Sequence, residues 1–202
     1  MTIIGVTGNL SAGKTAVANI LKKHGAVGFD ADAVAKTMIR KGKPAHQALL
    51  KLFGREILLP GGQVDRKKLA ERVFNNVQDL KKLNVLIHPG VIFEALSFIQ
   101  KNKKKRGMLV LDVPLLFESK MDGLADWTLV VRSPLAAGMR RSEEKGISRS
   151  LAKKILSTQW PIAKQAEHAD FVIDNDGSLK ELEKKVLAVM KEINRVQLKG
   201  GI

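Results

Sequence analysis

The sequence predicts an α/β fold in which helices flank a parallel sheet of five strands. Short runs of apolar residues alternate with helical patterns along the chain, and runs that are apolar throughout are typical of strands buried on both faces of a parallel sheet. A phosphate-loop motif lies between the first run and the first helical pattern, which is its usual place in such folds. A long helical stretch separates the second run from the third and predicts an insertion.

The five apolar runs are the predicted strands, and they span residues 2–7, 26–29, 108–111, 129–131 and 171–173. A first helix is predicted over residues 14–23, directly after the phosphate-loop motif. A closing helix is predicted over residues 178–193, with Ser178 as its N-cap and Glu181 in the capping-box position. The basic segment 194–202 is expected to fray, and the sequence assigns it no role.

The stretch from residue 45 to residue 99 contains no convincing strand, and its three helical patterns span residues 67–74, 80–87 and 91–99. His88-Pro89 separates the last two patterns. This pair predicts a helix boundary, because proline disfavours the helical conformation of the residue before it. From the residues alone, His88 is as well explained by a buried or capping role as by a functional one.

Composition limits the classes of protein to which the chain can belong. Its 202 residues, 45% of them hydrophobic, suit one domain with a substantial core. No cysteine is present, so disulfides and thiolate metal sites are excluded. The N-terminus lacks a charged leader and a cleavage site, which argues against a signal peptide. No apolar run approaches the roughly 20 residues of a membrane span, and we expect a soluble protein.

The net charge of +15 favours anionic partners. Nucleic acid is one explanation, and a substrate with several phosphates is another, because a basic surface steers either one. Aromatic residues make up only 4% of the chain and tyrosine is absent, so platforms for stacking bases are scarce. The densest basic run, residues 101–106, is expected to be a solvated helix end, where cations meet the negative pole of the helix dipole.

A complete phosphate-loop motif, G-x-x-x-x-G-K-[ST], is present as Gly8-Asn9-Leu10-Ser11-Ala12-Gly13-Lys14-Thr15. Main-chain N–H groups of such a loop form a concave anion site, and the following helix adds partial positive charge. Lys14 is expected to hold the β- and γ-phosphates of a nucleotide, and the Thr15 hydroxyl to ligate Mg²⁺. Ala16 continues the loop into the helix. The alternative is a chance match at a glycine-rich turn.

Two further acidic positions follow predicted strands. Leu109-Val110-Leu111-Asp112 has the apolar-then-aspartate pattern of a Walker B strand, so Asp112 could hold Mg²⁺ through water beside the phosphate loop. The second strand leads into Asp30-Ala31-Asp32. One of these carboxylates could orient an acceptor hydroxyl and take its proton, while the other caps the next helix. The alternative is that both aspartates are helix caps.

The guanine-reading motif Asn-Lys-x-Asp is missing, since the nearest string, Asn102-Lys103-Lys104-Lys105, lacks the aspartate. This absence argues against a GTPase. Helicases and larger ATPases usually need a longer chain. Size therefore favours a kinase that acts on a small molecule.

From Ile3 to about Met190 the sequence resembles the dephospho-CoA kinase family. The matching segments occur in order: Gly5-Val6-Thr7-Gly8 leading to Gly13-Lys14-Thr15, Asp30-Ala31-Asp32, Phe53-Gly54, residues 61–66 with Leu69, His88-Pro89, Asp112-Val113-Pro114-Leu115-Leu116-Phe117-Glu118, Gln159-Trp160-Pro161, residues 169–175 and Gly177. No single segment is decisive, but the ordered set leaves little room for another family.

The resemblance implies a P-loop kinase fold and a reaction in which ATP, with Mg²⁺, phosphorylates the ribose 3′-hydroxyl of dephospho-CoA in the cytoplasm. It implies that Asp32 is the base, that Lys14 bridges the β- and γ-phosphates and that Arg140 neutralises charge on the transferring group. It further implies an acceptor site lined by Asp32, His88, Pro114, Leu115, Leu116 and Glu118. The adenine of ATP would be bordered, mostly through main chain, by Asn175 and Gly177.

The resemblance also implies a division of the chain. The expected core comprises residues 1–35, 106–138 and 168–194, a helical acceptor-binding insertion spans residues 36–105, and a lid spans residues 139–167. The substrates would be small molecules. We expect no nucleic-acid or membrane partner, and a monomer or a weak homo-oligomer.

The chain departs from the family pattern in its loop and its lid. The commoner loop reads Gly-Gly-Ile-Gly-Ser-Gly-Lys, whereas here Asn9 and Ser11 replace two glycines and Ala12 replaces the serine. Asparagine tolerates left-handed backbone, so Ser11 is the replacement expected to cost affinity or rate. In the lid, Glu144 stands where the family often has a second arginine. Either Arg141 or Lys145 would then substitute, or that contact is lost.

Three alternatives compete with this interpretation. The chain could be another nucleoside or nucleotide kinase, which acceptor specificity would reveal. It could be a basic, nucleotide-regulated nucleic-acid-binding protein, which would bind in a strongly salt-dependent way and release no ADP on addition of an acceptor. It could also be an inactive relative that only binds ATP, but Asp32, Lys14 and Arg140 are all present.

Overall fold

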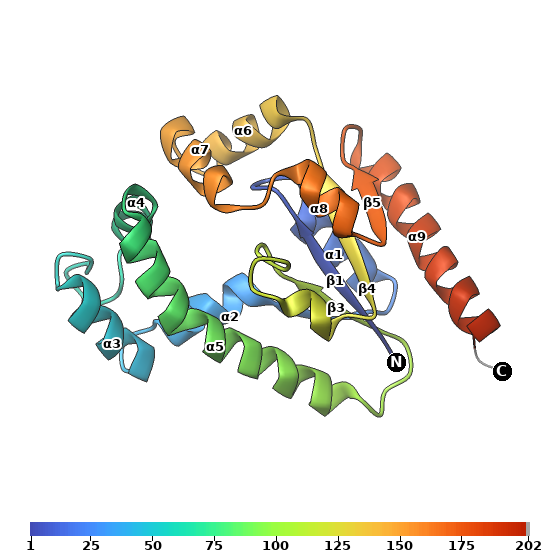
Figure 1. Ribbon diagram of the computed structural model, residues 1–202, viewed down its shortest axis with the longest axis horizontal. Coiled ribbons are helices and arrows are strands. Elements are labelled where there is room, and N and C mark those ends of the chain that lie inside the picture. Colours follow the sequence, from blue (N-terminus) through green and yellow to red (C-terminus); the bar gives the residue numbers. More distant parts are fainter. Residues whose placement is uncertain (201–202) are drawn as a thin grey trace.

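The computed structural model describes residues 1–200. Its elements, in chain order, are β1 (Thr2–Gly8), α1 (Lys14–Lys23), β2 (Val27–Asp30), α2 (Ala31–Met38), α3 (Pro44–Phe53), α4 (Arg66–Asn75), α5 (Val77–Asn102), β3 (Met108–Asp112), η1 (Met121–Leu124), β4 (Trp127–Arg132), α6 (Leu135–Glu144), α7 (Arg149–Thr158), α8 (Ile162–His168), β5 (Phe171–Asp174) and α9 (Leu179–Gly200). Figure 1 shows how they are arranged.

The five strands form one parallel sheet in the order β2-β3-β1-β4-β5, which confirms the predicted sheet. Alternate side chains of a strand point to opposite faces. Ile4, Val6 and Val110 therefore lie in a buried cluster with α1 and α9, whereas Ile3 and Leu109 lie in a second cluster with α2 and α5. Both faces of the sheet are thus covered by helices.

Each predicted strand is present, and all five extend one residue past the predicted carboxyl end. Three strands end on an aspartate, namely Asp30, Asp112 and Asp174. The apolar criterion stopped short of these residues because they carry charge. Asp30 and Asp112 are register partners on neighbouring strands. The structure therefore gathers acidic side chains at the edge of the sheet where the phosphate loop also lies.

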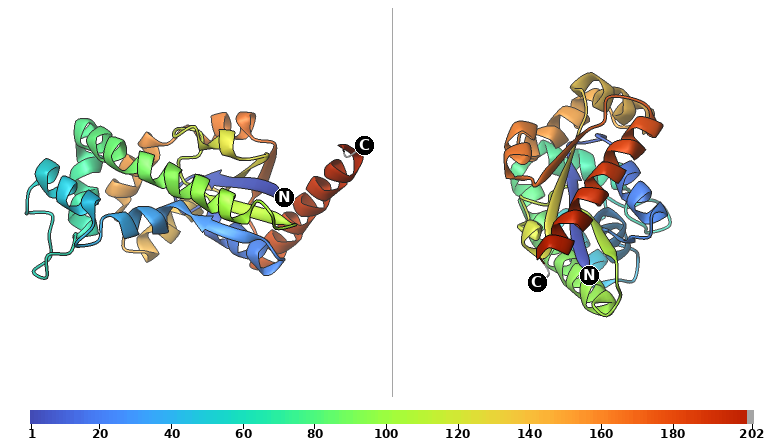
Figure 2. Two further views of the ribbon diagram at one scale, coloured as in Figure 1. Left: turned by 90° about the horizontal axis from the view of Figure 1, so that it is seen from below. Right: turned by 90° about the vertical axis from the view of Figure 1, so that its right-hand side faces the viewer.

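The long stretch between β2 and β3 is helical, as predicted. Helices α3 and α4 lie away from the sheet at one end of the molecule, opposite the C-terminal part of α9 (Figure 2). They have a buried apolar cluster of their own, made of Leu49, Phe53, Ile57, Leu69 and Val73. Helix α4 also contacts α7, and the Lys154 ammonium donates a hydrogen bond to the Asn75 side-chain oxygen.

The predicted helix boundary at His88-Pro89 is wrong, because α5 runs without interruption through Pro89. A proline inside a helix removes one hydrogen bond, here the bond to the Val85 carbonyl. Val85 is 70% exposed, so water can satisfy that carbonyl. On the opposite side, Val91 and Ala95 pack into the cluster on the sheet, and this packing holds the helix together.

By length and apolar composition alone, α5 could cross a membrane, since an 18-residue window has a mean hydropathy of 1.3. This helix was not singled out from the sequence, because only uninterrupted apolar runs were considered, and polar residues such as Asn84 and Glu94 interrupt the apolar residues of α5. Packed helices of soluble proteins satisfy the same criterion. Beyond the end of α5, residues 103–106 of the basic run are exposed, as expected.

The closing helix begins with the predicted capping box, in which Ser178 N–H donates to Glu181 Oε2 and Glu181 N–H donates to Ser178 Oγ. The expectation of a frayed segment after residue 193 is wrong, because α9 continues to Gly200. Ile193 is buried in the core, and the Gln197 amide donates to the Thr2 hydroxyl. These contacts tie the last turns to β1. Residues 201–202 of the expected tail lie outside the described residues.

Candidate active site

The phosphate loop connects β1 to α1, and two of its glycines have backbone that other residues rarely adopt. Gly8 has φ 144° and Gly13 has φ 108°. A Cβ on Gly8 would clash with the Val131 carbonyl, and a Cβ on Gly13 would clash with the Asn175 side chain. Gly13 is the N-cap of α1. The loop can therefore close over the helix N-terminus only with glycine at both places.

The Lys14 side chain folds back over the loop. Its ammonium donates to the carbonyls of Gly8 at 2.9 Å and Asn9 at 3.0 Å. Burial lowers the pKa of Lys14 below its usual value, while the carboxylates of Asp112 and Asp32 oppose this effect. Lys14 thus lies within the electrostatic influence of both acids that the sequence singled out.

Thr15 and Asp112 meet directly, since the Thr15 hydroxyl donates to Asp112 Oδ2 at 3.1 Å. Burial raises the pKa of Asp112 to about 6, although Lys14 and this hydrogen bond oppose the rise. No group of three or more His, Cys, Asp or Glu side chains within residues 1–200 could hold a metal ion. A hydroxyl and a carboxylate are hard oxygen ligands, and they suit a Mg²⁺ ion that keeps water and phosphate oxygens as its other ligands.

The two aspartates after β2 have different roles. Asp30 is the N-cap of α2, because its Oδ1 accepts a hydrogen bond from Ala33 N–H at 2.9 Å. Asp32 lies in the first turn of the helix, with a carboxylate that makes no hydrogen bond within the described residues. Loss of hydration raises the pKa of Asp32, and Asp30 adds to the rise, whereas Lys36 and Lys14 oppose it. A raised pKa makes the Asp32 carboxylate a stronger proton acceptor than an ordinary aspartate.

The segment after β3 surrounds the loop on another side. The Pro114 carbonyl accepts hydrogen bonds from Thr7 Oγ1 and from Gln159 Nε2. Glu118 Oε1 accepts from Trp160 N–H at 2.6 Å. Leu116 is fully buried and packs against Gly5, so it supports the wall of the site from behind. Leu115 is half-buried.

His88 is half-buried on α5, and burial lowers its pKa below the usual value. The imidazole is therefore neutral at pH 7. A neutral imidazole can accept or donate a hydrogen bond at the expected acceptor site without adding charge to it.

The two neighbouring lid arginines point in different directions. Arg140 has a side chain that is 74% exposed, and its Nε lies 3.7 Å from Glu144. Arg141 Nη1 instead donates to the Ser11 carbonyl at 3.1 Å and lies 3.5 Å from the Ala12 carbonyl. In the structure, Arg141 is thus the arginine in contact with the phosphate loop.

Ser11 has φ 54° and is the only loop residue other than glycine, among those described, with left-handed backbone. The positive angle thus falls on Ser11 and not on Asn9. The hydroxyls of Ser11 and Ser142 lie 3.0 Å apart and share a hydrogen bond. A glycine could not make this contact, so the replacement also links the loop to α6.

Two amide side chains that sequence reasoning did not assign to the loop hold it in place. Gln159 Oε1 accepts from Leu10 N–H at 3.0 Å, and Gln165 Nε2 donates to Asn9 Oδ1 at 3.1 Å. The only sequence signal for Gln159 was its place in the Gln159-Trp160-Pro161 match. Asn175 was expected to border adenine mostly through main chain; in the structure its side chain also donates to the Ala12 carbonyl at 2.8 Å.

A cavity of about 440 Å³ opens beside the loop, between α6 and the carboxyl ends of β4 and β5. Its lining includes Leu10, Pro134, Met139 and Asp176. Gly177 lies just beyond it, against the Glu181 carboxylate. Ala16 packs on the core under the loop. The cavity lies next to the expected phosphate site and has apolar walls that suit a nucleotide base.

Comparison with known proteins gives one consistent result. A family model described as dephospho-CoA kinase matches residues 2–181. A dephospho-CoA kinase of Fusobacterium nucleatum is 41% identical over 187 residues, covering 91% of this chain and 94% of the relative. One of Geobacillus kaustophilus is 36% identical over 194 residues, covering 94% and 95%. The solved dephospho-CoA kinase of Campylobacter jejuni has a TM-score of 0.69 at 26% identity, covering 96% of this chain and 98% of that one.

Proposed function

The chain belongs to the dephospho-CoA kinase family, and we infer from this that it transfers the γ-phosphate of ATP to the ribose 3′-hydroxyl of dephospho-CoA. The products are CoA and ADP, and the reaction is the last step in making coenzyme A. The observation that carries this inference at the residue level is the position of Lys14, Asp32 and Asp112 around one phosphate loop.

In the proposed reaction, the ribose 3′-oxygen attacks the γ-phosphorus of ATP. The bond between that phosphorus and the oxygen bridging to the β-phosphate breaks, and ADP leaves with the electron pair. Asp32 orients the hydroxyl and accepts its proton. The raised pKa of Asp32 and its free carboxylate support this role over that of a helix cap, which Asp30 already fills.

The phosphate loop, residues Gly8 to Ala16, would hold the triphosphate through its N–H groups. Lys14 would turn from the carbonyls of Gly8 and Asn9 to the β- and γ-phosphate oxygens and offset their charge. Arg140 is proposed to reach the transferring group from the lid, which requires it to leave Glu144. Arg141 would keep the loop and α6 together, as its contact with Ser11 suggests.

A kinase that uses ATP requires a divalent metal ion, and we propose Mg²⁺ held by Thr15 and Asp112. When bound, the ion would offset the charge of the β- and γ-phosphates. Asp112 must be deprotonated to serve as a ligand or to hold a coordinated water, and Thr15 would exchange its bond to Asp112 for the metal.

We propose that the acceptor binds against a wall formed by Asp32, His88 and the segment Pro114 to Glu118. Leu115 would lie on the surface of this wall, and the buried Leu116 would support it from inside. Asn175 and Gly177 would border the adenine of ATP. The division into core, helical insertion and lid remains our proposal, and the separate buried cluster of α3 and α4 supports it. We place the enzyme in the cytoplasm, as a monomer or weak homo-oligomer, with no nucleic-acid partner.

A coupled assay of ADP release with dephospho-CoA, adenosine and AMP as acceptors tests the proposed function. Release with dephospho-CoA should exceed that with the other two, and the product should carry phosphate on the 3′-oxygen. Preference for adenosine or AMP would make the chain a different nucleoside or nucleotide kinase. ATP binding without ADP release under any acceptor would make it an inactive relative.

A further inference from the structure

A second cavity, of about 650 Å³, opens beside the C-terminal end of α2. Its walls come from two segments, residues 36–41 and 59–66, and its lining includes four cations, Lys36, Arg40, Lys41 and Arg66. All four lie in the insertion expected to bind the acceptor, residues 36–105, but none was individually assigned to ATP or to a part of the acceptor. The insertion therefore contains a strongly basic cavity whose cations have no assigned role.

The positive charge of this cavity is not neutralised by the protein. Asp65 is the only acidic residue of its lining, and the Asp65 carboxylate already caps α4 by accepting from the N–H groups of Lys67 and Lys68. Within the part of the chain that the structure describes, none of the four cations forms an ion pair. Four cations around one hollow suit an anion with more than one charge.

The cavity lies in line with the proposed base. Lys36 is four residues after Asp32 on α2, so the two side chains share a face of the helix and are about 6 Å apart along its axis. Lys36 is also the cation that most strongly opposes the raised pKa of Asp32. A separation of one helical turn is comparable with the width of a ribose, whose 3′-oxygen and 5′-oxygen lie on opposite sides of the ring.

The wall opposite α2 is a well-anchored turn. Leu58 and Val64 form an antiparallel bridge, and Leu59 N–H donates to the Gln63 carbonyl at 2.8 Å. Lys41 Nζ donates to the Gly61 carbonyl at 3.2 Å, and the His46 ring lies 3.0 Å from the Gly62 carbonyl. Contacts within the turn and from Lys41 and His46 thus fix the position of this wall.

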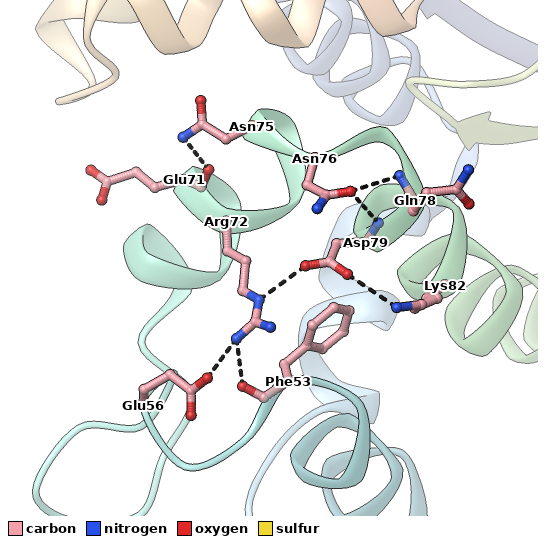
Figure 3. Close-up of polar contacts among 9 residues, drawn as sticks. All are labelled: Phe53, Glu56, Glu71, Arg72, Asn75, Asn76, Gln78, Asp79 and Lys82. Carbon is pink, nitrogen blue, oxygen red and sulfur yellow. Dashed lines mark hydrogen bonds and ion pairs between the residues drawn. The ribbon is translucent and has the colours of Figure 1, made fainter.

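The base of this turn is fixed by Arg72, as Figure 3 shows. Arg72 Nη1 donates to the Phe53 carbonyl at 2.8 Å and to Glu56 Oε1 at 2.6 Å, and Arg72 Nε donates to Asp79 Oδ2 at 3.0 Å. One guanidinium therefore connects α3, the start of the turn, α4 and α5. The turn that carries one wall of the cavity is thus anchored to three helices of the insertion.

We propose that this cavity binds the diphosphate group of the acceptor, which joins its adenosine and pantetheine parts. The proposal rests on the proposed function, because only then does an acceptor ribose lie at Asp32. With the 3′-hydroxyl at Asp32, the 5′-diphosphate extends along α2 past Lys36 towards Arg40 and Arg66. These cations would select acceptors with a 5′-diphosphate over adenosine, which lacks one.

Arg40→Gln and Arg66→Gln, each made singly, test this assignment, with Arg55→Gln as the matched control. Arg55 is an exposed arginine on the same insertion and is not part of the lining of the cavity. At saturating ATP, the KM for dephospho-CoA should rise about tenfold or more in the two test variants, because each loses a charge-assisted hydrogen bond. The value of kcat should change by no more than about threefold, and the KM for ATP should stay the same.

Inhibition by adenosine, measured as competition with dephospho-CoA, provides the second readout. Its inhibition constant should be the same in the test variants and the wild type, since adenosine has no diphosphate. An unchanged KM for dephospho-CoA, an equal rise in Arg55→Gln, or an equal loss of adenosine binding would overturn the assignment. By contrast, a wild-type protein without ADP release on dephospho-CoA would refute the proposed function itself.

Discussion

Replacing Asp112 with asparagine should stabilise the nucleotide-free protein while removing its activity. Burial raises the pKa of Asp112 from 3.8 to about 6. Above pH 6 the carboxylate is ionised in the folded protein, and this buried charge lowers the free energy of unfolding. At about 1.4 kcal/mol for each pH unit, a rise of this size corresponds to about 3 kcal/mol at pH 7.5. Asparagine carries no charge and can still accept the hydrogen bond from Thr15.

The stabilisation should depend on pH in a defined direction. Between about pH 4 and 6 the folded wild type binds more protons than the unfolded chain, so its stability falls as pH rises through this window. The advantage of Asp112→Asn should therefore be about 3 kcal/mol at pH 7.5, roughly half of that at pH 5 and close to zero at pH 4. For a chain of this size, the value at pH 7.5 corresponds to a rise in Tm of about 6–12 °C.

Thermal and urea unfolding of the metal-free and nucleotide-free proteins at pH 7.5, 5 and 4 would measure these differences. Glu94→Gln is the control, because it removes the same charge from an exposed position on α5 and should shift stability little at any of the three pH values. Added Mg²⁺ and ATP should stabilise the wild type more than the variant. A variant that is less stable at pH 7.5, or an advantage that does not shrink on acidification, would refute the reasoning.

Three more substitutions probe the loop and the base. Asp32→Ala should leave the Kd for ATP nearly unchanged and lower kcat by roughly 100-fold or more, and wild-type turnover would exclude Asp32 from the mechanism. Gly13→Ala should weaken ATP binding, measured by titration calorimetry, because the new methyl displaces Asn175 from the loop; unchanged binding would contradict this. Ser11→Gly should alter the unfolding free energy by less than about 1 kcal/mol, since relief of left-handed strain offsets the lost bond to Ser142. A loss above about 2 kcal/mol would contradict this balance.

Much of the fold could be predicted because its signals are local. Strands buried on both faces must be apolar throughout, so β1 and β3 were found directly, and the phosphate-loop motif marked the turn into α1. Continuity of α5 through Pro89 could not be predicted, since it depends on packing of Val91 and Ala95 against the sheet. A local pattern contains no information about such distant contacts.

The site was predicted less completely, for a related reason. Motifs identified the residues at strand ends, but contacts made by side chains from distant segments were missed. Gln159 reaches Leu10 across 149 positions of sequence, and Arg141 reaches Ser11 across 130. The cationic cavity likewise combines residues 36–41 with residues 59–66. Neither segment has a pattern that indicates a binding site alone, so the cavity became apparent only in the folded chain.

The contact between α4 and α7 joins the two arms of the molecule that lie on either side of the phosphate loop (Figure 1). If α7 moves when a nucleotide binds, α4 must therefore move with it, or the hydrogen bond from Lys154 to Asn75 must break. A coupling free energy between the nucleotide site and the acceptor site is the same whichever ligand binds first. If bound ATP changes the affinity of the enzyme for its second substrate, that substrate changes the affinity for ATP by the same factor.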